Sequence, residues 1–125
     1  MTVRQIIAVV DDEPGILRGI ERLLSHHDFD TEVYGSGEAF LARSEFARLA
    51  CAILDIHLGG MSGIEVRRQL AVRNATLPII FMTAVDSRAV RNEAIRAGHA
   101  AFLPKPFSAE ELVNAVRQAT ARLHI

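Results

Sequence analysis

The sequence predicts a doubly wound α/β fold, in which one parallel sheet carries helices on both faces. Short apolar runs without the alternation of a one-sided sheet recur along the chain, which is typical of strands buried on both faces. Segments of helical periodicity separate these runs, so that five strands alternate with five helices. Right-handed crossovers leave few topologies, and the flavodoxin-like strand order 2-1-3-4-5 is the commonest of them for five strands.

The first half of the chain predicts two strands and two helices. The apolar run at residues 6–10 is expected to be a strand, and Pro14 is suited to the first turn of a helix that extends to about residue 26. Residues 30–34 alternate in polarity, which indicates an exposed strand near an edge of the sheet. A short helix is expected at residues 38–42, and no pattern defines where it ends.

The second half predicts three more strands and three more helices. Short apolar runs place the strands at residues 51–54, 78–83 and 101–103. Two of the helices are expected at residues 63–74 and 87–97, the second of them ending at Gly98, a natural left-handed terminator. Ser108 and Glu111 form a capping box that is expected to begin the last helix. The apolar residues of this helix recur at helical spacing: Leu112, Val113, Val116 and Leu123.

Length and composition limit the chain to one folded unit. We expect residues 1–125 to form a single domain, because this length suits one hydrophobic core and 50% of the residues are hydrophobic. A formal net charge of −1 gives no electrostatic signature of direct nucleic-acid or membrane-surface binding. The sequence has no membrane-span pattern, no signal-peptide core and one cysteine, Cys51, which cannot form an internal disulfide. These observations favour a cytoplasmic location.

Polar residues follow four of the five predicted strands at their carboxyl ends. Asp11 and Asp12 follow the first strand, Asp55 the third, Thr83 ends the fourth and Lys105 comes just after the fifth. In a parallel sheet these side chains should face one crevice. Three carboxylates so close repel one another, so the arrangement predicts a cation, and oxygen ligands favour Mg²⁺. Taken alone, Asp55 could also be a loop cap and Thr83 an ordinary strand residue.

Lys105 is distinguished by composition. It is the single lysine among 14 basic residues, the other 13 being arginine, and it stands between Pro104 and Pro106. A compact ammonium on a flexible stem suits a phosphoryl oxygen or a carboxylate, and we expect the Lys105-Pro106 bond to be cis. Together with Mg²⁺ it would nearly neutralise three carboxylates. Asp55 is then the central candidate for a nucleophile toward phosphorus, with Thr83 as a hydroxyl donor.

Four motifs together resemble one known family. The segments VVDDEPG, LDIHLGGMSG, MTA and LPKPF, in this order and spacing, are similar to the receiver domain of two-component response regulators over Ile6 to about Arg122. The resemblance implies that Asp55 accepts a phosphoryl group from a sensor histidine kinase or a phosphotransfer protein. It also implies a Mg²⁺ site with these ligands: Asp12, Asp55, the backbone carbonyl of His57 and, through a water molecule, Asp11.

The resemblance further implies a switch. Thr83, the backbone amide of Ala84 and Lys105 would contact the phosphoryl oxygens, and Phe102 would turn inward when Thr83 moves. Residues 87–123 would form the surface that is read by a downstream output domain or protein partner, or by a second copy in a phosphorylation-dependent homodimer. The domain itself would be a phosphoacceptor switch and not an enzyme, beyond self-catalysed phosphotransfer and slow autodephosphorylation.

Several departures and alternatives accompany this interpretation. Gly59 stands where the family often has proline, and His57 and Val85 occupy positions that tune the lifetime of the acyl phosphate in similar proteins. A Mg²⁺-dependent aspartyl-phosphate phosphohydrolase is disfavoured, because its nucleophile follows the first strand in a DxD pattern, whereas Asp11 and Asp12 are adjacent here. The acidic first loop argues against a flavin-binding module. A receiver-like interaction module that takes no phosphate is the remaining alternative.

Overall fold

The computed structural model describes residues 3–73, 75–98 and 101–121 as alternating strands and helices. Leu123, expected on the last helix, lies outside the described residues. The elements are β1 (Ile6–Val10), α1 (Pro14–His26), β2 (Asp30–Tyr34), α2 (Gly37–Leu41), β3 (Leu49–Asp55), α3 (Gly63–Val72), β4 (Ile79–Thr83), α4 (Arg88–Ala97), β5 (Ala101–Pro104) and α5 (Ala109–Ala121). The expected alternation of strands and helices is therefore confirmed.

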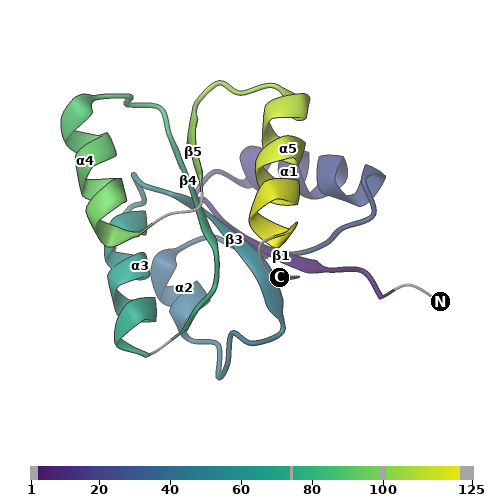
Figure 1. Cartoon of the computed structure of the whole chain (residues 1–125), viewed down its shortest axis with the longest axis horizontal. Helices are drawn as coiled ribbons and strands as arrows, with labels where there is room; N and C mark the ends of the chain where they lie inside the picture. Colours follow the sequence, from purple (N-terminus) through teal and green to yellow (C-terminus); the bar gives the residue numbers. More distant parts are fainter. Residues whose placement is uncertain (1–2, 74, 99–100, 122–125) are drawn as a thin grey trace.

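The sheet has the flavodoxin-like topology that the sequence predicts. Its strand order is β2-β1-β3-β4-β5, and all four neighbouring pairs are parallel. Figure 1 shows α1 and α5 on one side of the sheet and α2, α3 and α4 on the other. Each side has its own hydrophobic cluster, one with Leu24 and Leu112 from α1 and α5, the other with Phe40 and Leu70 from α2 and α3. The chain is thus a three-layer sandwich whose strands all end at one edge.

Element boundaries differ from the sequence prediction mainly at β3. This strand was expected at residues 51–54 but extends over Leu49–Asp55, and all seven of its residues are buried. The sequence pattern stops at Asp55 because the residue is charged, yet its backbone still pairs with Met82 of β4. Asp55 is consequently the last residue of a central strand, held by the sheet, and its side chain emerges at the carboxyl edge.

Helix ends follow the local capping chemistry. Ser36, Ser62 and Ser87 each accept a hydrogen bond from the backbone amide three residues later, at the start of α2, α3 and α4. The cap at Ser36 places α2 at Gly37–Leu41, one residue earlier than expected. Gly98 ends α4 with a φ of 87°, as predicted, and the capping box of Ser108 and Glu111 is formed in both directions.

Gly63 packs so closely against β3 that it should not tolerate a side chain. A Cβ atom built there would lie 2.3 Å from the carbonyl oxygen of Asp55. We therefore expect Gly63→Ala to lower the free energy of unfolding by about 1–3 kcal/mol, measured by urea denaturation. Gly19→Ala on α1 is the control, because a Cβ there meets nothing within 4 Å, and it should stabilise by about 0.5–1 kcal/mol. Equal stabilities for the wild type and Gly63→Ala would contradict this packing.

Candidate functional site

Three carboxylates meet at the carboxyl edge of the sheet. Asp11 follows β1 directly, Asp12 is the next residue in the same loop, and Asp55 ends β3. Each contributes an oxygen atom, and these atoms lie within 4.8 Å of one another. Asp11 is 0% exposed and Asp55 5%, whereas Asp12 is exposed to solvent. The cluster is therefore buried on one side and open on the other.

Lys105 reaches this cluster from the loop after β5. Its Nζ atom donates hydrogen bonds to Oδ2 of Asp11 at 2.9 Å and to Oδ2 of Asp55 at 3.0 Å. The backbone amide of Lys105 donates to the carbonyl oxygen of Thr83 at 2.6 Å, and the Lys105-Pro106 bond is cis, as expected. One ammonium group is thus shared by two buried carboxylates that come from different strands.

Backbone amides complete the hydrogen bonding of the carboxylates. The amide of Glu13 donates to Oδ1 of Asp11 at 2.9 Å, and the amide of His57 donates to Oδ1 of Asp55 at 3.0 Å. The amide of Gly59 donates to Oδ2 of Asp12 at 3.2 Å, which ties the loop after β3 to the loop after β1. Proline at position 59 could not make this bond, because it has no N–H group. Each carboxylate therefore has an amide donor that fixes one of its oxygens.

The ionisation of Asp55 reflects competing influences. Burial raises the pKa of its carboxyl group above the ordinary value, and the neighbouring carboxylate of Asp11 acts in the same direction. The hydrogen bonds from Lys105 and from the His57 amide oppose this effect without cancelling it. Burial alone would lower the pKa of Lys105, but its bonds to Asp11 and Asp55 outweigh burial and raise it. The ammonium faces two carboxylates, so one cation does not fully offset the negative charge.

Thr83 ends β4 beside this cluster. The residue is fully buried, and its hydroxyl oxygen accepts a hydrogen bond from the backbone amide of Val85 at 3.0 Å. The same hydroxyl group is placed to donate to the carbonyl oxygen of Val85 at 3.2 Å. Ala84, between them, is exposed. The hydroxyl group of Thr83 is thus held by the backbone of Val85.

Phe102 lies on β5, three residues before Lys105. Its side chain is half-buried, and it is opposite Phe81 in the register of β4 and β5. The guanidinium carbon of Arg91 in α4 lies 4.6 Å from the centroid of the Phe102 ring. This arginine contact was not foreseen from the sequence, in which Arg91 is one of many arginines.

The acidic cluster has the composition of a divalent cation site. Carboxylate oxygens are hard ligands, and magnesium is commonly held by one or two carboxylates together with water and a phosphate. The three carboxylate oxygen atoms lie within 4.8 Å of one another, an arrangement that fits such an ion. Since Lys105 leaves the charge only partly offset, a cation would complete the neutralisation.

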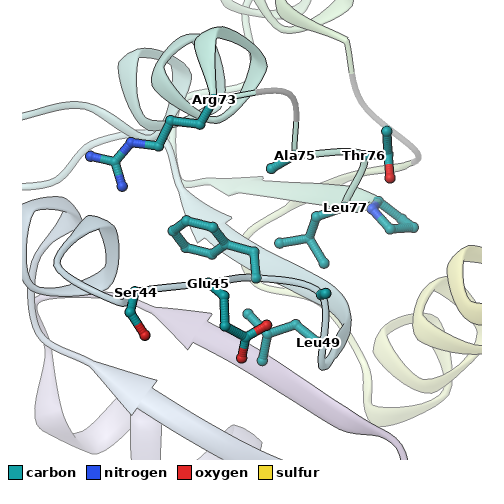
Figure 2. A pocket seen from close by; sticks show the side chains of 10 residues that line it. Ser44, Glu45, Leu49, Arg73, Ala75, Thr76 and Leu77 are labelled. Atoms are coloured by element: carbon teal, nitrogen blue, oxygen red, sulfur yellow. The ribbon is translucent and has the colours of Figure 1, made fainter.

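A cavity lies at the opposite edge of the sheet. It measures about 460 Å³ and is bordered by the beginning of β3 at Leu49 and by Leu77 and Pro78 just before β4. Figure 2 shows its mixed lining, with Glu45 and Arg73 near apolar side chains. Glu45 forms an ion pair with Arg43, and Arg73 donates to the carbonyl oxygen of Leu41. These polar groups already have partners, and we assign the cavity no role.

The fold and the acidic crevice define a class of doubly wound α/β domain with a cluster of carboxylates at the carboxyl edge of its sheet. Comparison with known families is more specific: residues 7–117 match the model of the response regulator receiver domain. The chain belongs to this family, as the motifs around Asp11, Asp55, Thr83 and Lys105 indicate. Within the described residues, no helix is long and apolar enough to cross a membrane.

Three similar proteins illustrate the relationship. The chain is 35% identical to response regulator MprA of Mycobacterium bovis, over 98% of this chain and 52% of that protein. It is 33% identical to response regulator protein TodT of Pseudomonas putida, over 91% of this chain and 50% of that protein. A solved structure described as the BeF3-activated DrrB receiver domain has 27% identity and a TM-score of 0.86, covering 96% of this chain and 100% of that one. The chain thus spans about half the length of the two response regulators.

Proposed function

We propose that this domain is a switch activated by phosphorylation of Asp55, with a sensor histidine kinase or a phosphotransfer protein as the phosphoryl donor. The observation that carries the proposal is the sharing of Lys105 between Asp11 and Asp55 next to a third carboxylate. Such a pocket offers a nucleophilic oxygen together with the positive charge that an incoming phosphoryl group requires.

The proposed metal ligands are Asp12, Asp55 and the backbone carbonyl of His57, with Asp11 acting through a water molecule. Mg²⁺, when bound, supplies positive charge next to the phosphoryl oxygens. Hydrogen bonds within the chain orient these carboxylates. The Gly59 amide donates to Asp12 and the Glu13 amide to Asp11, while Lys105 bridges Asp11 and Asp55.

The transfer step needs little from the protein beyond alignment and charge. An oxygen of Asp55 forms a bond to phosphorus while the bond between phosphorus and the donor nitrogen breaks, and the electron pair stays on that nitrogen. Oδ1 of Asp55 is held by the His57 amide, and Lys105 is within reach of the new phosphoryl oxygens. Thr83 and the amide of Ala84 would contact the remaining oxygens.

The switch would begin at Thr83. A phosphoryl group adds negative charge and acceptor oxygens, which would draw the Thr83 hydroxyl away from Val85 and move the loop after β4. Phe102 would then turn inward, and the surface formed by residues 87–123 would change. That surface would be read by an output domain, a protein partner or a second copy of the chain.

Intact-mass measurement tests the proposal directly. The purified chain is incubated with a small acyl-phosphate donor, with Mg²⁺ or with a chelator. We expect a gain of one phosphoryl group with Mg²⁺ and almost none with the chelator, because the carboxylates repel the donor when no cation is bound. Absence of any gain with Mg²⁺ would contradict the proposed function.

A stable mimic of the phosphoryl group gives a second measurement. The DrrB receiver domain is described as BeF3-activated. We propose that BeF3 binds at Asp55 of this chain in the same way, and that the amide NMR signals of Ala84 and Lys105 report the binding.

A further inference from the structure

Arg91 connects the two segments that the proposed switch would move. It lies at the end of the first turn of α4 and contacts Asp86 in the loop after β4 as well as Phe102 on β5. The loop begins at Ala84, directly after Thr83 at the end of β4, and β5 leads to Lys105. The side chain of Arg91 therefore contacts both the loop after β4 and β5, the two segments that lead to the proposed phosphorylation site.

The contact with Asp86 is made in two places. Nε of Arg91 donates to Oδ1 of Asp86 at 2.5 Å, and Nη2 donates to Oδ2 at 3.1 Å. This paired geometry uses the planar fork of the guanidinium group and fixes the direction of the carboxylate. Asp86 is the residue next to Val85, whose backbone holds the Thr83 hydroxyl. The loop is thus fixed by Thr83 on its inner side and by Arg91 on its outer side.

The contact with Phe102 uses the face of the aromatic ring. The guanidinium carbon lies 4.6 Å from the ring centroid, within the range of a cation–π interaction. Because the guanidinium group covers the ring, an inward turn of Phe102 would separate the two. A movement of the loop after β4 relative to α4 would likewise separate Asp86 from Arg91.

We infer that Arg91 is a positioning residue that stabilises the unphosphorylated arrangement through its joint contacts with Asp86 and Phe102. This inference rests on the proposed function. A contact that is present only in the resting arrangement must lower the affinity for any group that favours the other arrangement. Removal of Arg91 should therefore make the phosphoryl mimic bind more tightly, although Arg91 does not touch Asp55.

The test is a titration of the chain with BeF3 in the presence of Mg²⁺, followed by amide NMR of Ala84 and Lys105. For Arg91→Ala we expect the half-saturating BeF3 concentration to fall about threefold, the scale of an exposed cation–π contact combined with an exposed ion pair. Arg91→Lys should lie between this variant and the wild type, because lysine restores the charge but not the paired hydrogen bonds. Asp86→Ala should also lower the concentration, and the two effects should not add.

Arg22→Ala is the matched control. Arg22 is also an exposed helical arginine, and its side chain forms no hydrogen bond or ion pair in the described part of the chain, so BeF3 binding should stay as in the wild type. A half-saturating concentration for Arg91→Ala that is unchanged or higher would overturn the inference. No response of the wild type to BeF3 would instead contradict the proposed function, which keeps the two failures distinct.

Discussion

Replacement of Asp55 by asparagine should abolish the Mg²⁺-dependent gain of phosphoryl mass. Asparagine has nearly the same shape, so the His57 amide can still donate to the side-chain oxygen. Its amide group carries no anionic oxygen, however, and it is a poor nucleophile toward phosphorus. With a small acyl-phosphate donor, intact-mass analysis should show no phosphorylated species under conditions that label most of the wild type.

Asp28→Asn is a suitable control for this experiment. Asp28 has an exposed side chain, is far from the acidic crevice in the fold and has a φ of 68°, which asparagine tolerates well. This variant should be labelled like the wild type. If Asp55→Asn were still labelled, peptide mapping would identify the acceptor, and label on Asp11 or Asp12 would assign the nucleophile to the first loop.

The location of the site residues at one edge of the sheet was predictable from the sequence, because both the type of each side chain and its position just after a predicted strand were informative. An apolar run that ends at an acid marks the carboxyl end of a buried strand, and parallel strands bring such ends to one edge. Asp11, Asp55 and Lys105 could therefore be brought together before any geometry was known. The structure adds that Lys105 bonds to both carboxylates, which no spacing in the sequence indicates.

The groups that hold the carboxylates could not be predicted in this way. They are the amides of Glu13, His57 and Gly59, and every residue except proline carries such an amide, so the side chains give no signal. The contact of Arg91 with Phe102 could not be predicted either, because nothing in the sequence distinguishes Arg91 from the other arginines. The start of β3 at Leu49 was missed although Leu49 and Ala50 are apolar, and the pairing of Leu49 with Ile6 shows that the strand includes them.

Replacement of Lys105 by methionine should destabilise the chain strongly when no Mg²⁺ is present. Methionine keeps an unbranched side chain but leaves Asp11 and Asp55 without their shared cation. Removing one partner of a buried ion pair costs about 3–5 kcal/mol, and we expect a loss near the lower value because Asp12 and the mouth of the crevice are open to water. Urea denaturation at pH 7 measures the loss.

The pH dependence of this loss follows from the direction of the pKa shifts. The pKa of Lys105 is raised, so its contribution is complete at neutral pH and disappears only as the pH rises through the raised value, in the alkaline range. Lys105 lowers the pKa of Asp55, which burial raises, so this pKa should be higher in Lys105→Met, and protonation in the acidic range should favour the folded variant more than the folded wild type. The deficit of Lys105→Met should therefore become smaller as the pH falls from 7 toward 5.

Magnesium should restore part of the stability of Lys105→Met at pH 7, because an ion that binds only the folded chain shifts unfolding by mass action. Arg22→Met, which removes an exposed arginine, should change stability by less than about 0.5 kcal/mol and show no such rescue. If Lys105→Met matched the wild type at pH 7 without Mg²⁺, the carboxylates would not need the lysine for charge compensation. The ammonium group of Lys105, placed between Asp11 and Asp55, would then serve to bind an incoming phosphoryl group and would not stabilise the fold.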